Sequence, residues 1–432
     1  MPLLRRPVRI RWWIFIYLFA FAMLSYVQRT SIGIAAERIE PELHLSQMQI
    51  GWIMWAFTVM YTVMQAPAGV FGQRYGARLT FFIVGAVGCL AMIATPVAPM
   101  LLTGTAMFIA LVFFQALLGV SQAPVFPVFA GVCEAWFPAR QWAMANGVNS
   151  SGMTLGTALA PPLIVLLTQG FGWQGALLWL ALPSLVLTVL WTWYARNTPR
   201  EHPSVTAEEL AELGAGADEP RAPLTWARFR ALATNRDVVA LAVSYVCMNY
   251  LFYLLTNWSF LYLVQERHLT ALESGVLAMV PPIGAAIGSA VGGFLTDALV
   301  IRLGARRGYR FVPLVFLPVA GALLLVVTQV SSPFVAVAGL TLAFFATEIT
   351  EGPYWAATMR AARADSMAAT GVLNTGGNVG GVIGIPIVAF LSGHGSWNAA
   401  FATGTAFALV AAGAWLLVDP DRGLVAVMPA GR

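Results

Sequence analysis

A single arginine stands inside a long apolar run near the start of this chain. The run begins at Trp12, and Arg29 lies near its end, between Gln28 and Thr30. A positive charge inside hydrocarbon costs about 3 kcal/mol on insertion scales, so such residues usually serve a purpose. No acid stands beside it in the sequence, which leaves the guanidinium available for a carboxylate from a bound ligand or from another helix.

Two carboxylates stand in a second apolar run, "AFFATEITEGPYWAATM". Glu348 and Glu351 are three residues apart, so we expect them on one face of a helix, with Trp355 one turn beyond Glu351. Intramembrane acids mark ligand pathways or proton relays. One of the two is expected to take up and release a proton, or to pair with Arg29 as a purely structural ion pair.

The composition places these residues in a membrane protein. Of the 432 residues, 59% are hydrophobic and only 10% charged, whereas soluble domains have about 25% charged residues. A helix that crosses hydrocarbon needs about 20 apolar residues. By that measure there are twelve candidate spans: 12–35, 47–72, 79–98, 101–126, 142–168, 173–194, 237–264, 274–299, 311–330, 333–358, 366–392 and 397–418.

The polar stretch 195–235 divides the spans into six and six. It predicts a cytoplasmic linker with one short amphipathic helix, between an N-terminal bundle (1–194) and a C-terminal bundle (236–432). All 24 basic residues are arginines, grouped in short loops, which indicates membrane topology and no nucleic-acid partner. With the N-terminus cytoplasmic, only Arg38 and Arg267 fall in outer loops. We therefore expect both termini in the cytoplasm.

The two halves repeat a loop motif. "GVFGQRYGARL" follows the second span and "GGFLTDALVIRLGARRG" follows the eighth. Glycines permit close helix contact, and arginines can bind helix-end carbonyls or a carboxylate. These loops predict a cytoplasmic gate, with the following gating residues: Arg74, Arg78, Asp297, Arg302 and Arg306. Matching halves are typical of transporters with a site between the repeats.

At these residues the sequence resembles the major facilitator superfamily, and in particular its anion:cation symporter branch. The resemblance covers almost the whole chain. It rests on "SYVQR", "YTVMQAPAGVFGQRYGARL", "LLGVSQAPVFPVFAGVCEAWFP", "NWSFLYL", "GGFLTDALVIR" and "GVLNTGGNVGGVIGIPIV", in that order. It implies an all-α membrane protein of twelve transmembrane helices in two pseudo-symmetric six-helix bundles. Helices 1, 4, 7 and 10 would line a central cavity for sugar acids or other organic anions.

The sequence departs from the branch where the branch carries its ionisable groups. Tyr26 and Arg29 match the helix-1 motif, but the acid between them is Gln28. In helix 4, Gln115 and Gln122 replace an arginine and a glutamate, and Met153 replaces a glutamine in helix 5. An amide does not titrate. The resemblance and the residues together predict a substrate site made of Arg29, Tyr26, Tyr61, Gln115, Gln122, Asn374 and Trp355, with proton coupling at Glu348 or Glu351.

These observations predict a secondary active transporter. No phosphate loop, zinc-protease motif or nucleophile elbow is visible, and the three cysteines are far apart, so we expect no enzyme, cofactor or metal site. The expected partners are a small organic anion, such as a sugar-acid-like or aromatic acid, protons and the lipid bilayer. We expect a monomer in a bacterial inner membrane. An exporter or exchanger of amphiphilic molecules in the same fold is the alternative.

Overall fold

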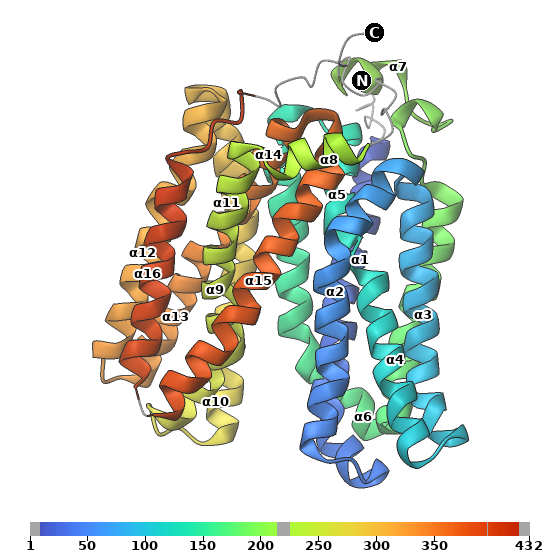
Figure 1. Ribbon diagram of the computed structural model, residues 1–432, viewed down its shortest axis with the longest axis vertical. Coiled ribbons are helices and arrows are strands. Elements are labelled where there is room, and N and C mark those ends of the chain that lie inside the picture. The colour runs from blue at the N-terminus through green and yellow to red at the C-terminus, as the bar shows by residue number, and fades with distance from the viewer. Residues whose placement is uncertain (1–8, 214–224, 395, 423–432) are drawn as a thin grey trace, which may run out of the picture.

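The computed structural model describes residues 9–213, 225–394 and 396–422, and these are almost entirely helical (Figure 1). Residues 214–224 of the predicted linker lie outside the described residues. The helices of the first half are α1 (Ile10–Leu43), α2 (Gln47–Tyr75), α3 (Ala77–Leu101), α4 (Gly104–Gln122), α5 (Val125–Trp136) and α6 (Trp142–Tyr194). Those that follow are α7 (Ala207–Leu213), α8 (Trp226–Ala233), α9 (Arg236–Gln265), α10 (Ala271–Leu277), α11 (Val280–Leu303), α12 (Ala305–Gln329), α13 (Pro333–Glu348), α14 (Glu351–Ala362), α15 (Ser366–Gly393) and α16 (Trp397–Trp415).

The predicted twelve-helix membrane fold is confirmed. Within the described residues, ten stretches are long and apolar enough to cross a membrane. One of them, Ala139–Tyr194, contains two spans, because the chain leaves helical geometry at Gly172, where φ is 70°. Glycine adopts such a positive φ without steric cost. The last span is α16, which packs against α12 and α9.

Two of the predicted spans, 101–126 and 333–358, are each broken in the structure. The fourth span consists of α4 and α5, with the break at Ala123 and Pro124, and the tenth consists of α13 and α14, with the break at Ile349 and Thr350. Pro124, and Pro353 in the tenth span, have no N–H to donate to the carbonyl four residues earlier. The two breaks occupy corresponding positions in the two halves.

The linker forms two short helices in its described part, where the sequence predicted one. Of these, α7 packs on the first half, since the buried Glu209 carboxylate accepts the backbone N–H groups of Ile10 (3.2 Å) and Arg11 (3.1 Å). A carboxylate in this position satisfies donors that a helix start otherwise leaves unpaired. The second helix, α8, precedes α9 and contacts the end of α15.

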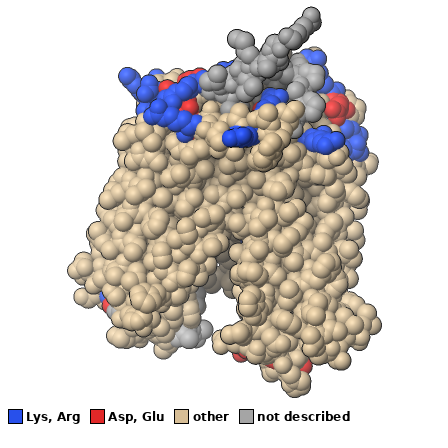
Figure 2. All heavy atoms as spheres, in the orientation of Figure 1, with Lys and Arg blue, Asp and Glu red and all other residues tan. Residues whose placement is uncertain are grey.

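Figure 1 shows α1 to α6 on one side of the molecule and α9 to α16 on the other. In the space-filling view, a hollow separates the two sides at one end (Figure 2). Most arginines in this view lie at the opposite end, where α7 and α8 are found and where the two sides meet. The molecule therefore opens away from its arginine-rich end.

Asp297 joins the two sides at the arginine-rich end. Its carboxylate, near the end of α11, accepts the backbone N–H groups of Ala143 (3.2 Å) and Met144 (2.8 Å) at the start of α6. The first N–H groups of a helix have no partner within the helix and carry partial positive charge, so a carboxylate binds them well. Asp297 thus holds the second half against the first.

The expected pairing of Asp297 with Arg302 and Arg306 is not formed. Arg302 is exposed, and Arg306 lies 3.5 Å from the carboxylate of Asp419 within the second half. Both arginines follow Asp297 along the chain, Arg302 in the last turn of α11 and Arg306 in the first turn of α12, whereas the Asp297 carboxylate is directed across the interface to α6.

The other two expected gating arginines also act within their own half. Arg78 donates through Nη2 to the carbonyl oxygen of Thr192 at 2.7 Å, and Arg74 lies over the ring of Tyr75 at 5.2 Å. Helix-end carbonyls attract cations because they are left without intrahelical donors. These contacts brace α2, α3 and α6 and do not cross to the second half.

Small residues bring α6 and α11 into direct contact beside Asp297. Ser289 donates its hydroxyl to the carbonyl oxygen of Gly147 at 2.9 Å. A Cβ built on Gly293 would lie 2.5 Å from the carbonyl oxygen of Ala143, closer than real Cβ contacts. The two sides can therefore meet here only because these positions have little or no side chain.

We predict that Gly293→Ala opens the arginine-rich end, since the added methyl group collides with the Ala143 backbone. A cysteine introduced at Ser289, a fully buried position, should then react with a thiol reagent several-fold faster. Gly51→Ala is the matched control, because nothing lies within 4 Å of a Cβ built there. Both variants must first be shown to be monodisperse and helical. Equal labelling rates in the two variants would then show that this contact does not hold the interface closed.

Candidate functional site

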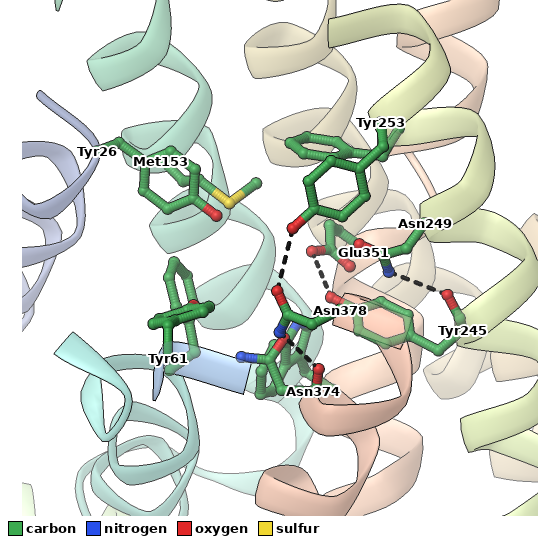
Figure 3. Close-up of a pocket in the computed structure, with 12 residues that line it drawn as sticks. Tyr26, Tyr61, Met153, Tyr245, Asn249, Tyr253, Glu351, Asn374 and Asn378 are labelled. Atoms are coloured by element: carbon green, nitrogen blue, oxygen red, sulfur yellow. Dashed lines mark hydrogen bonds between the residues drawn. The ribbon is translucent and has the colours of Figure 1, made fainter. Parts of the chain in front are cut away.

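A pocket lies between the two sides of the molecule (Figure 3). Its walls are mostly aromatic, with amides, one thioether and one carboxyl group. The first half contributes Tyr26, Tyr61, Phe126 and Met153, and the second contributes Tyr245, Asn249, Phe252, Tyr253, Glu351, Trp355, Asn374 and Asn378. Concave, largely apolar walls with a few polar groups are typical of small-molecule sites.

Arg29 contacts the rings of two of the lining tyrosines. Its guanidinium carbon is 4.5 Å from the ring centroid of Tyr26 and 4.2 Å from that of Tyr61, with Phe57 at 4.9 Å. Aromatic faces attract cations at such distances. Within the described part of the chain Arg29 forms no ion pair, so the structural Arg–Glu pair considered from the sequence is absent. A cation without an acidic partner can accept a ligand carboxylate.

Glu351 faces the pocket from the break in the tenth span. It is the first residue of α14, and its side chain is almost completely buried. Tyr245 donates its phenol to Oε1 at 2.9 Å, while Oε2 has no hydrogen-bond partner among the described residues (Figure 3). The helix start favours a carboxylate here. Glu351 is therefore an acid with one oxygen committed to the protein and one available.

Glu348 does not line the pocket. It ends α13, is fully buried, and neither carboxyl oxygen has a hydrogen-bond partner in the described chain. Between it and Glu351 the chain changes from α13 to α14 at Ile349 and Thr350. Of the two predicted proton-coupling residues, only Glu351 reaches the pocket.

Two of the predicted substrate-binding glutamines also lie away from the pocket lining. Gln122 donates to the side-chain oxygen of Gln28 at 3.3 Å, and Gln28 in turn donates to Ser184 and to the carbonyl oxygen of Leu180 (3.0 Å). This network joins α1, α4 and α6 inside the first half. Gln115 is buried, with no partner for its Nε2 among the described residues.

The other predicted binding residues meet at the pocket. Tyr26, Tyr61, Trp355 and Asn374 all line it. Asn374 also donates to the side-chain oxygen of Gln65 at 2.9 Å, which links α15 to α2 across the two halves. The structure therefore brings these four side chains together with Arg29, from helices that are far apart in the sequence.

Sequence reasoning missed Tyr245, Tyr253 and Asn378. Tyr253 donates to Asn378 at 3.0 Å, and Tyr245 holds Glu351 (Figure 3). One signal was available for Asn378, which lies four residues after Asn374 and so on the same face of the helix. The two tyrosines had no such signal, because aromatic residues form 12% of the chain and a tyrosine within a span is therefore common.

We predict that Gln28→Asp, which restores the acid found in the resembling branch, destabilises the protein. The shorter side chain loses the Nε2 donor shared by Ser184 and Leu180 and buries a charge. The cost should be about 1–3 kcal/mol, measured as a lower melting temperature. Gln47→Glu, on the exposed first turn of α2, serves as the control. An unchanged melting temperature for Gln28→Asp would contradict the network.

Curated relatives match nearly the whole chain. It is 25% identical to "Probable galactarate/D-glucarate transporter GudP" of Escherichia coli (strain K12), covering 97% of this chain and 95% of the relative. It is 28% identical to the "Hexuronate transporter" of Bacillus subtilis (strain 168), covering 90% of each. It is 27% identical to "Probable sulfoacetate transporter SauU" of Cupriavidus necator, covering 92% of this chain and 91% of the relative.

Solved structures share the fold. The proton:xylose symporter XylE superposes with a TM-score of 0.75 at 12% identity, over 93% of this chain and 94% of that one. FucP in the outward conformation gives a TM-score of 0.71 at 15% identity, over 94% and 99%. Residues 18–370 match the Major Facilitator Superfamily. The chain is a multi-pass membrane protein that belongs to the Major Facilitator Superfamily, whose members are transporters and not enzymes.

Proposed function

We propose that this protein moves a small organic anion across a bacterial inner membrane by alternating access, coupled to protons. The observation on which this proposal rests is Arg29, a cation without an acidic partner behind the aromatic wall of a pocket between the two halves. Its similarity to bacterial carriers of sugar acids and sulfoacetate supports the same substrate class. Arg29 is the anchor for the substrate carboxylate.

Glu351 is the proposed proton carrier. The sequence Gln122-Ala123-Pro124 stands at the break of the fourth span, and Glu351-Gly352-Pro353 stands at the break of the tenth. Four residues after each, Phe126 and Trp355 face one another with ring centroids 5.9 Å apart. The two tripeptides thus correspond across the repeat. The acid that the resembling branch carries in the first half has a counterpart here in the second half.

The arginine distribution supports cytoplasmic termini, since cytoplasmic loops are enriched in arginine. In that orientation α7 and α8 lie in the cytoplasm and the hollow in Figure 2 opens outward. One chain contains the complete pocket, so a monomer suffices for transport. An exporter or exchanger of amphiphilic molecules is the second candidate, favoured by the aromatic walls. This second candidate would be favoured if the protein binds neutral or cationic amphiphiles and does not bind carboxylates.

We predict that Arg29→Lys is nearly as damaging as Arg29→Ala. Lysine lacks the planar fork that binds a carboxylate through two N–H groups and that stacks on Tyr26 and Tyr61. Both variants should lose at least about tenfold in affinity for organic acids, because a bidentate charged contact is lost. The measurement is ligand-induced thermal stabilisation of the purified proteins. Wild-type affinity in the lysine variant would leave only a generic positive charge at this position.

We predict that Glu351→Gln abolishes uphill, proton-driven uptake in liposomes but keeps counterflow, because exchange needs no net proton movement. Glu348→Gln is compared in parallel, since it makes the same change at a carboxyl outside the pocket. Loss of uphill uptake in the Glu348→Gln variant alone would assign proton coupling to Glu348. Accumulation by both single variants and by the double variant under an imposed proton gradient would contradict proton coupling at either glutamate.

A further inference from the structure

Few charged side chains lie at or next to the pocket. Among the described residues that line it, Glu351 is the one side chain that can carry charge at neutral pH, and it is an acid. The neighbouring cation is Arg29, behind Tyr26 and Tyr61 in the first half. The remaining lining groups are amides, phenols, aromatic rings and a thioether. With Glu351 protonated, the described site therefore has one positive charge to compensate one negative charge on a ligand.

Two phenols of the wall contributed by the second half already have hydrogen-bond partners. The phenol of Tyr245 is donated to Glu351, and that of Tyr253 is donated to Asn378. The indole N–H of Trp355 has no partner among the described residues, and neither has Oε2 of Glu351, which is an acceptor when Glu351 is ionised. A ligand hydroxyl or amide N–H could donate to it, whereas a second carboxylate would meet an acid with no cation within this wall.

None of the described residues that line the pocket carries a positive charge. An anion removed from water without a partner is strongly disfavoured, because its lost hydration is not replaced. The second carboxylate of a diacid would therefore lose its hydration without gaining a cation from the lining.

We infer that the site takes monocarboxylates whose far end is an uncharged hydrogen-bond donor, and that it rejects dicarboxylates. This inference rests on the proposed function and narrows its substrate class. The carboxylate binds Arg29, the body of the ligand packs against the rings of Tyr26, Tyr61 and Trp355, and the far-end donor reaches Glu351. Aldonic acids and hydroxylated aromatic acids meet this description, whereas aldaric acids do not.

The test compares acids that differ at one end only. The first pair is gluconate and glucarate, which differ by a terminal hydroxyl or carboxylate. The second pair is 4-hydroxybenzoate and terephthalate, which differ in the same way on an aromatic body. Binding to the purified wild-type protein is measured by calorimetry at pH 7.5, where both diacids are dianions. In each pair that binds, the diacid should bind at least about tenfold more weakly, since like charges at a binding surface are costly.

The monoamide of terephthalate, 4-carbamoylbenzoate, separates charge from size. It has nearly the size of terephthalate but carries one charge and keeps an N–H donor at its far end, so it should bind more tightly than the diacid does. Equal or tighter binding of the diacids, or a monoamide as weak as terephthalate, would overturn the inference while leaving organic-anion binding intact. If none of these acids binds, and Arg29→Ala changes nothing, the proposed function itself fails.

Discussion

A guanidinium enclosed by aromatic rings, with no carboxylate beside it, is the interaction on which this site depends. Water is the usual partner of a charge, and hydrocarbon offers none. Tyr26, Tyr61 and Phe57 present their ring faces to Arg29, which stabilises the cation without neutralising it. A carboxylate from a neighbouring helix would have been more stabilising in the empty protein, but it would also have competed with an anionic ligand for the same N–H groups.

The rest of the polar core follows from this arrangement. Inside the first half, Gln122 donates to Gln28 and Gln28 donates to the helix backbone, so these two positions place amides and not acids in the first half. The acid lies in the second half at Glu351, where a broken helix supplies a helix start and Tyr245 holds one oxygen. Cation and acid thus belong to different halves of the molecule. A movement that separates the halves would therefore also separate the cation from the acid.

The contact that closes the arginine-rich end uses helix ends and small residues, not pairs of opposite charges. Asp297 binds the backbone at the start of α6, and Gly293 lets that backbone approach α11. Such a contact has a strict geometry, because backbone donors do not move independently of their helix. It can therefore break as a unit when α6 and α11 separate, whereas flexible arginine side chains would follow a displaced carboxylate.

The sequence by itself determined the membrane fold and its twelve spans, because each span needs about 20 apolar residues whatever surrounds it. It also predicted Arg29 and Glu351 as site residues, since charged groups are conspicuous in apolar runs. Trp355 was predicted from its place one turn beyond Glu351, and Tyr26, Tyr61 and Asn374 were predicted from the family resemblance; these four residues and Glu351 line one pocket. It could not decide which side chains face the pocket. Glu348 and Glu351 look equivalent along the chain, but only Glu351 lines the pocket. Gln122 turns inward to Gln28, and Asp297 binds α6 rather than the arginines that follow it. Those outcomes depend on where helices from opposite halves meet, and that information resides in the packing of distant segments, not in local spacing.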